Sequence, residues 1–204
     1  MKKDSLLYTV VFSFTVTFLF VLFLALANEG TVGIVERNQE LARQKAVLSA
    51  MAVSFKSDEE VRTLYGSIEI VDKEGVRLFK GTQGLQRVYA KEFRGSGLWG
   101  TITGIVAVDE SVSQIVGIQI VSHNETPGLG GRIAEPWFKE QFRGLKVKNG
   151  KIQVTYGSEA GSGKGNKEQG VADGITGASR TSQSMDRILN NELTVLKKIL
   201  GGSK

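Results

Sequence analysis

An uncharged, strongly apolar stretch over residues 6–27 constrains this chain more than any other feature. Every Lys, Arg, Asp and Glu of the 204-residue sequence lies outside it. A helix of this length, rising about 1.5 Å per residue, would extend roughly 33 Å, which matches the hydrocarbon core of a bilayer. The stretch therefore predicts a transmembrane helix. About 177 residues follow it, enough for one ordinary domain with a buried core.

Basic residues on either side of this stretch indicate its orientation. Lys2 and Lys3 precede it, whereas the next basic residue after it is Arg37. The positive-inside rule then predicts a single-pass protein of the cell (inner) membrane, with residues 1–5 in the cytoplasm and the domain outside. A cleaved signal peptide is the alternative, because residues 25–27 (ALA) have the form of a cleavage site. Signal peptides carry apolar cores of only about 7–15 residues, so an uncleaved anchor is favoured.

Composition excludes several kinds of site. The chain has no cysteine and one histidine, His123, which removes disulfides, thiolate metal sites, cysteine nucleophiles and multi-histidine centres. We therefore predict no metal site, no catalytic residue of a conventional Ser-His-Asp triad and no cysteine nucleophile. The net charge of +5 is spread in runs of at most two basic residues, without interleaved aromatics, so no nucleic acid is expected as a partner.

Patterns after the apolar stretch predict an α+β domain, a mainly antiparallel sheet with helices packed on it. Apolar spacing and capping signals predict helices over 37–53, 58–65, 136–143 and 182–200. β-branched segments between turn signals predict strands over 67–72, 75–79, 86–93, 98–109, 114–121, 145–148 and 151–156, the last two joined by a tight Asn149-Gly150 turn. The predicted organisation is a cytoplasmic N-terminus (1–5), the membrane helix (6–27), a helical connector (28–57) and the extracytoplasmic domain (58–204).

Two loops, 122–133 and 157–181, could carry chemistry. The second is long and glycine-rich, yet it lacks the spacing of a P-loop. Its last residues directly precede the final helix, and a helix N-terminus suits a phosphate group. Alternatively, Ser179, Thr181 or Ser182 only caps that helix. The first loop contains a Pro-Gly turn that could let a flat ring approach the backbone, or it is only a turn, with His123 as a surface or hydrogen-bonding histidine.

Taken together, the two loops resemble a known family. The segments ETPGLGG at 125–131 and DGITGAS at 173–179 are similar to the FMN-binding domain found in the G subunit of the Rnf complex and in the C subunit of the sodium-translocating NADH:quinone reductase. A single N-terminal membrane helix and Gly97-Leu98-Trp99 before a long strand agree with this resemblance, which covers most of residues 37–200. In that family the motif D-x-x-[ST]-G-A-[TS] receives FMN from a separate flavin transferase, and the flavin phosphate becomes esterified to the last hydroxyl.

Residue by residue, the resemblance implies a covalent FMN site. Ser179 is the implied attachment residue, where the family usually has threonine, and Thr181 is the alternative. The resemblance implies that the transferase recognises Asp173 and Thr176, and that the small residues Gly177 and Ala178 leave space for the transferase beside the attachment residue. The residues implied to lie against the isoalloxazine are Glu125, Thr126, Pro127, Gly128, Leu129 and Gly130, with Trp99 or Leu129 covering a ring face.

The function implied is electron relay by a covalently flavinylated subunit of an ion-translocating oxidoreductase, of Rnf or NADH:quinone reductase type. The partners implied are the flavin transferase and membrane subunits of the same complex, including a flavin-bearing and an iron–sulfur-bearing subunit. Two alternatives stay open: an anchored flavoprotein that serves an extracellular reductase or a redox sensor, and a non-redox anchored domain that binds a ligand or the cell wall.

Overall fold

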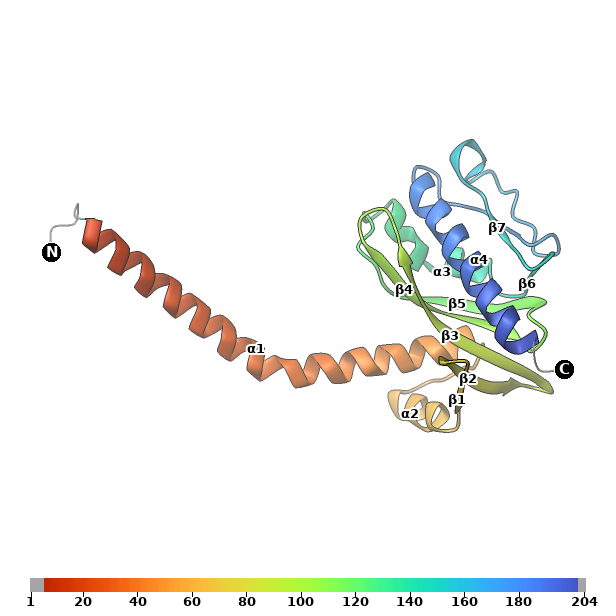
Figure 1. Cartoon of the computed structure of the whole chain (residues 1–204), viewed down its shortest axis with the longest axis horizontal. Coiled ribbons are helices and arrows are strands. Elements are labelled where there is room, and N and C mark those ends of the chain that lie inside the picture. The colour runs from red at the N-terminus through yellow and green to blue at the C-terminus, as the bar shows by residue number, and fades with distance from the viewer. Residues whose placement is uncertain (1–5, 202–204) are drawn as a thin grey trace. The chain divides into compact units, whose positions relative to one another are not determined.

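The computed structural model describes residues 6–201, and its first element is one uninterrupted helix. Helix α1 runs from Leu6 to Ala50 (Figure 1), so the two helical segments predicted at 6–27 and 37–53 are continuous. Gly30 and Gly33 lie between them, and each costs a helix only about 1 kcal/mol, too little to break it in the absence of proline. The N-terminal part of α1 is long and apolar enough to cross a membrane. The basic pair at positions 2 and 3 lies outside the described residues.

The chain divides into two compact units, one ending at Leu41 and the other beginning at Ala42. In the second unit, six strands form one sheet in which each strand pairs antiparallel with the next along the chain. They are β1 (Glu69–Lys73), β2 (Val76–Gln83), β3 (Gln86–Ser96), β4 (Thr101–Asp109), β5 (Gln114–Ser122) and β6 (Leu145–Lys146). The prediction of a mainly antiparallel sheet with packed helices is confirmed.

Both faces of β4 are buried, whereas the edge strand β1 has no buried residue. Ile102, Val106 and Val108 point into a core that also contains α4 (Ser179–Gly201). Ile105 and Ala107, on the alternate positions, face a second core formed with the end of α1. This two-sided burial explains why β4 reads as a nearly continuous apolar run instead of alternating with polar residues.

The last helix supplies the largest wall of the first core. On α4, the predicted apolar face is fully formed, and its buried members are Met185, Leu189, Leu193, Leu196 and Leu200. Full burial of each such side chain contributes about 1.5–3 kcal/mol. Figure 1 shows α4 lying along the sheet. The helix begins three residues earlier than predicted, so that Thr181 and Ser182 lie inside it.

Two short α-helices and two 3-10 helices, η1 (Gly130–Ala134) and η2 (Gly157–Glu159), complete the described part of the unit. Helix α2 (Asp58–Gly66) follows its predicted cap: Ser57 Oγ accepts a hydrogen bond from the Glu60 amide at 3.2 Å. The Glu60 carboxylate reaches back to the amide of Lys56 at 2.7 Å, one residue before the cap. Helix α3 (Pro136–Glu140) is shorter than predicted, because the chain then tightens into turns that end at Gly144, which has φ +78°.

The predicted hairpin at Asn149-Gly150 forms only its turn. Lys148 and Lys151 exchange backbone hydrogen bonds of 2.9 and 3.0 Å across it. Beyond them the strands part, because β6 joins β5 while β7 (Gln153–Val154) pairs in parallel with β8 (Val171–Ala172). Side chains of α4 stabilise this departure: Asp186 accepts from the Val154 amide at 2.8 Å, and Asn190 accepts from the Ile152 amide at 2.9 Å.

Candidate functional site

Three segments that are distant in the sequence meet at the N-terminal end of α4. A Cβ atom added at Gly177 would lie 3.3 Å from Leu129 Cδ2, so the 125–131 and 173–179 segments are in contact. A Cβ atom at Gly97 would overlap the Glu125 carboxylate, which brings the turn between β3 and β4 to the same place. The structure thus gathers both motif segments and the 97–99 turn, as expected for one site.

Exposed apolar side chains surround this meeting point. Trp99 is 69% exposed, Leu98 50% and Leu129 45%. Pro127 and Gly128 are exposed beside them, and Gly128 has φ +73° with open space where a Cβ would be. Large apolar side chains that are exposed on a surface mark a contact site, and indole and leucine side chains are suited to pack against a flat ring.

Ser179 and Thr181, the two candidate attachment residues, lie in different environments. Ser179 is the first residue of α4 and is half-buried, and its Oγ accepts a hydrogen bond from the Gly157 amide at 3.2 Å. Thr181 is only 1% exposed, and its hydroxyl donates to Glu125 Oε2. Ser182, the third hydroxyl in this turn, is buried and accepts from the Ile175 amide at 2.9 Å. Of the three hydroxyls, only that of Ser179 is accessible.

The motif residues Asp173 and Thr176 hold the glycine-rich loop. The Asp173 carboxylate accepts from the amides of Gly161 (2.9 Å) and Gly163 (2.8 Å) and from the Thr155 hydroxyl (2.9 Å). The Thr176 hydroxyl donates to the Ala160 carbonyl at 3.1 Å. The segment 157–163 is therefore fixed against the motif, which places the Gly157 amide beside Ser179.

Glu125 and Gly130 lie inside the structure, although the sequence predicts them at the flavin ring. Glu125 is 4% exposed, and its Oε1 accepts from the amides of Leu98 and Trp99 at 2.9 and 3.1 Å. Gly130 is buried, and a Cβ there would lie 2.8 Å from Glu125 Oε2. Both residues therefore support the exposed turn from beneath, whereas Thr126, whose carbonyl accepts from the amides of Leu129 and Gly131, shapes the turn itself.

The N-terminal end of α4 combines a positive helix dipole with one buried carboxylate, that of Glu125, which accepts from Thr181 in the first turn. Helix α4 has 23 residues and no acidic residue in its first turn, so its free N–H groups and positive dipole end are not neutralised by its own side chains. Gly177, with φ +80°, and the buried Ala178 add no bulky side chain before it. His123 is engaged elsewhere, because its Nδ1 accepts from the Glu125 amide at 3.2 Å.

Two residues of this region were missed by sequence reasoning. Gln141 brackets Asp173, since its Oε1 accepts from the Asp173 amide at 2.7 Å and its Nε2 donates to the Asp173 carbonyl at 3.1 Å. Thr155 accepts from the Gly174 amide at 2.9 Å. Neither residue has a local sequence signal, because each acts on a segment that is distant along the chain.

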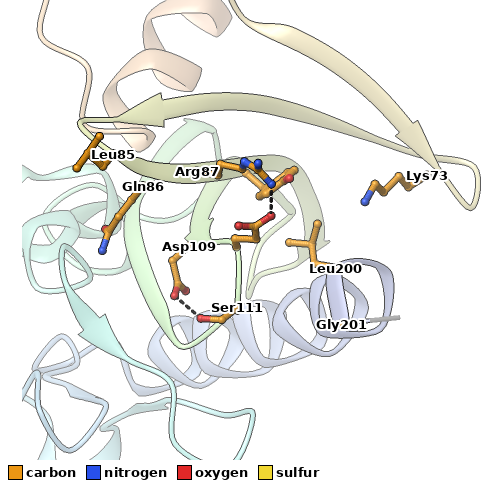
Figure 2. Close-up of a pocket in the computed structure, with 10 residues that line it drawn as sticks. Lys73, Leu85, Gln86, Arg87, Asp109, Ser111, Leu200 and Gly201 are labelled. Carbon is orange, nitrogen blue, oxygen red and sulfur yellow. Dashed lines mark hydrogen bonds and ion pairs between the residues drawn. The ribbon is translucent and has the colours of Figure 1, made fainter. Parts of the chain in front are cut away.

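A cavity of about 1050 Å³ lies at the other end of α4, where Leu200 and Gly201 line it (Figure 2). Three of its charged groups are engaged: Arg87 pairs with Glu110 at 2.8 Å, and Asp109 accepts from the Ser111 hydroxyl at 2.6 Å. None of the residues that line it belongs to the two motif segments. Ser179 is about 30 Å away along the helix, so this cavity is separate from the candidate site.

The arrangement fits FMN. A phosphate would lie at the N-terminus of α4, next to the Ser179 hydroxyl and the Gly157 amide, and the flat apolar ring would face Leu129, Leu98 and Trp99. This chain provides both parts of such a site from segments more than 40 residues apart.

Comparisons with known proteins also indicate an FMN-binding domain. A family model described as FMN-binding domain matches residues 97–194. The chain is 33% identical over 138 residues to the C subunit of the Na(+)-translocating NADH-quinone reductase of Neisseria meningitidis, and 34% identical over 144 residues to that of Haemophilus ducreyi. Each alignment covers 67% of this chain and 51% of the relative, so the chain spans about half the length of the curated relatives it matches.

Solved structures show the same fold. The crystal structure of the corresponding reductase subunit from Parabacteroides distasonis superposes with a TM-score of 0.65 at 26% identity, covering 81% of this chain and 95% of that one. NqrC of Shewanella oneidensis gives a TM-score of 0.66 at 20% identity, covering 83% and 100%. The resemblance found in the sequence is confirmed: residues 97–194 match the model of the FMN-binding domain, and the chain is similar to the C subunit of the Na(+)-translocating NADH-quinone reductase.

Proposed function

We propose that this chain is a membrane-anchored flavoprotein that carries FMN as a phosphoester on Ser179 and relays electrons within an ion-translocating oxidoreductase complex. One observation carries the proposal: the accessible hydroxyl of Ser179 lies at the N-terminus of α4, within a domain that matches the FMN-binding family. The similarity to the NADH-quinone reductase subunits favours a complex of that type, with an Rnf complex as the related alternative.

The residues have separate roles in this proposal. The N-terminus of α4 stabilises the negative phosphate, and the Gly157 amide orients Ser179 Oγ. Leu129, Leu98 and Trp99 cover the flat ring and exclude water from it. When bound, FMN supplies the transfer of one or two electrons, and no side chain has to transfer a proton or form a further bond.

Covalent attachment requires a second protein. A flavin transferase would form the bond between Ser179 Oγ and the flavin phosphorus of a flavin dinucleotide donor. The P–O bond from that phosphorus to the second phosphate would break, so that the nucleoside monophosphate leaves, and the hydroxyl proton of Ser179 would be released. Asp173 and Thr176 would then present Ser179 by fixing the 157–163 loop beside it. A covalent bond suits a domain outside the cytoplasm, because a dissociated FMN would be lost there. The electron donor and acceptor would be membrane subunits of the same complex, one bearing a flavin and one an iron–sulfur cluster.

The attachment test compares Ser179 with Thr181. The full chain, coexpressed with a flavin transferase, should be heavier by FMN less one water and should fluoresce on a denaturing gel. Ser179→Ala should abolish both signals, whereas Ser179→Thr should restore them because threonine offers the same hydroxyl. Thr181→Val should keep both signals, since Thr181 is buried and its hydroxyl bonds to Glu125. Loss of flavin in Thr181→Val with retention in Ser179→Ala would contradict the assignment.

A further inference from the structure

Glu125 is a buried carboxylate that neither electron transfer nor the phosphoester uses. Burying a carboxylate is costly unless its oxygens are hydrogen-bonded. Within residues 6–201 both oxygens are engaged by uncharged donors, Oε1 by the amides of Leu98 and Trp99 and Oε2 by the hydroxyl of Thr181. A carboxylate held by these hydrogen bonds has a structural role, and the segments that donate to it show which parts of the fold it joins.

Its partners belong to the two walls of the candidate site. Leu98 and Trp99 form the turn between β3 and β4, where the Gly97 amide also bonds to the Gly100 carbonyl at 2.7 Å. Thr181 lies in the first turn of α4, two residues after Ser179. Glu125 therefore joins the turn that carries the exposed indole to the helix that carries the attachment hydroxyl.

Two glycines allow this close packing. A Cβ atom at Gly97 would overlap Glu125 Oε1, and one at Gly130 would overlap the Thr181 hydroxyl. Any larger residue at either position would push the carboxylate away from its donors. The glycines at 97 and 130 are therefore needed for the hydrogen bonds of Glu125, since Gly97 packs against its Oε1 and Gly130 against its Oε2.

We propose that Glu125 is a positioning residue, whose carboxylate fixes Leu98 and Trp99 relative to the first turn of α4. If FMN is bound as proposed, Glu125 would fix the position of the turn that carries the indole, and Leu98 and Trp99 would be the residues that hold the ring. The proposal rests on the proposed function for the statement that this site binds a flavin. The hydrogen bonds from Leu98, Trp99 and Thr181 to Glu125, however, are present in the chain without a cofactor. The proposal is therefore testable in the flavin-free protein.

The test uses the full chain, without flavin and in detergent. The sequence has two tryptophans, so a Trp137→Phe background makes Trp99 the only indole. Glu125→Ala should speed amide hydrogen exchange at Leu98 and Trp99 by about tenfold or more, because both amides lose a charged acceptor. As the turn loosens, the fluorescence anisotropy of Trp99 should fall and the distribution of its fluorescence lifetimes should widen. Glu125→Gln should stay close to the parent chain, because its amide oxygen accepts from both amides.

Asp109→Ala is the matched control. Asp109 also holds a turn by accepting from backbone amides, those of Ser113 (2.7 Å) and Gln114 (2.8 Å), but it is the last residue of β4 and lines the cavity together with Leu200 at the end of α4 (Figure 2). Its loss should leave exchange at Leu98 and Trp99 unchanged. A folded Glu125→Ala chain with parental exchange at Leu98 and Trp99 would overturn the proposal, as would a Glu125→Gln chain as loose as Glu125→Ala.

If Glu125→Ala does not fold, Thr181→Val decides, because it removes only the bond on the helix side. Thr181→Val should raise the mobility of Trp99, measured by its fluorescence anisotropy, in a chain that still melts cooperatively. An anisotropy equal to that of the parent chain would overturn the proposal. In the flavinylated chain, Glu125→Gln should keep the visible flavin spectrum and Thr181→Val should shift it. Failure of flavin attachment in every chain would refute the proposed function alone, since the exchange measurements need no flavin.

Discussion

Three carboxylates, those of Asp109, Glu125 and Asp173, each hold a loop of this domain by accepting hydrogen bonds from two backbone amides. A charged acceptor strengthens such bonds relative to a neutral one. Each of these loops is therefore fixed by a single carboxylate. Asp109 is the last residue of β4, whereas Glu125 and Asp173 lie outside the strands. Two of the three loops belong to the candidate site, and the third does not.

Asp109 gives a prediction for acid stability. Burial alone would raise the pKa of Asp109, but the hydroxyls of Ser111 and Ser113 and the amides of Gln114 and Ser113 outweigh it and lower the pKa below 3.8. A lowered pKa in the folded state stabilises the fold above the unfolded pKa, and this stabilisation is lost as the pH falls through the folded pKa. The free energy of unfolding of wild type relative to Asp109→Asn should be constant above about pH 5 and shrink below about pH 4.

Urea titrations of the full chain from about pH 2 to 7 measure this difference. A Ser111→Ala, Ser113→Ala chain keeps the carboxylate but loses two of its donors, so its pH dependence should be weaker than that of the wild type. A difference between wild type and Asp109→Asn that does not vary with pH would contradict the prediction.

A glycine in the DGITGAS motif gives a second prediction. A Cβ atom at Gly174 would overlap the Thr155 carbonyl, which is backbone and cannot move aside easily. Gly174→Ala should lower the free energy of unfolding by about 1–3 kcal/mol. Gly66→Ala is the control, because nothing lies within 4 Å of its Cβ position, and its effect should stay below about 1 kcal/mol. Equal effects in urea titrations would show that the Thr155 carbonyl can yield.

At the scale of elements, those with strong local signals were predicted from the sequence. Helix α2 has its own cap at Ser57, and α4 carries its apolar face in one continuous segment. The short strands β7 and β8 were not predicted as a pair, because their partners are set by contacts with α4 and lie 18 residues apart. The same division holds at the site: the motif around Ser179 is local, whereas the burial of Glu125 depends on three segments meeting.

Helix α4 gives a prediction at this scale. Leu193 is fully buried against the sheet, whereas Val195, two residues on, is exposed. Leu193→Ala should destabilise the domain by about 2–5 kcal/mol because it removes buried methyl groups and leaves a cavity. Val195→Ala, with the same helical backbone and no cavity, should cost less than about 1 kcal/mol. Thermal melting followed by circular dichroism compares them, and a similar loss in both chains would contradict the packing.

At the scale of the whole molecule, helix α1 continues from a segment long and apolar enough to cross a membrane into the unit that contains the residues matching the FMN-binding domain model. The length and composition of the first part of α1 support the span, and Lys2 and Lys3 in the sequence predict its direction. The extracytoplasmic placement of the domain is part of the proposed function, because it is what makes covalent flavin advantageous.

Limited proteolysis tests this orientation. Protease added to intact right-side-out vesicles should digest the domain from residue 30 onward and leave a protected fragment that contains the apolar helix. Vesicles of inverted orientation serve as the control and should protect the domain. Digestion only in inverted vesicles would place the domain in the cytoplasm and remove the reason for a covalent cofactor.

The pairing of each strand with its neighbour along the chain affects the order in which parts of the protein fold during synthesis. Because these contacts are close in sequence, the sheet can begin to form while later residues are still being synthesised. The face that includes Phe93 and Ile102 nevertheless stays uncovered until α4 arrives, since that helix closes the core. Ser179 arrives with the same helix, at its first position. We therefore expect the flavin acceptor to be presented only by a chain whose core is complete, so that unfinished or truncated chains are not loaded with cofactor.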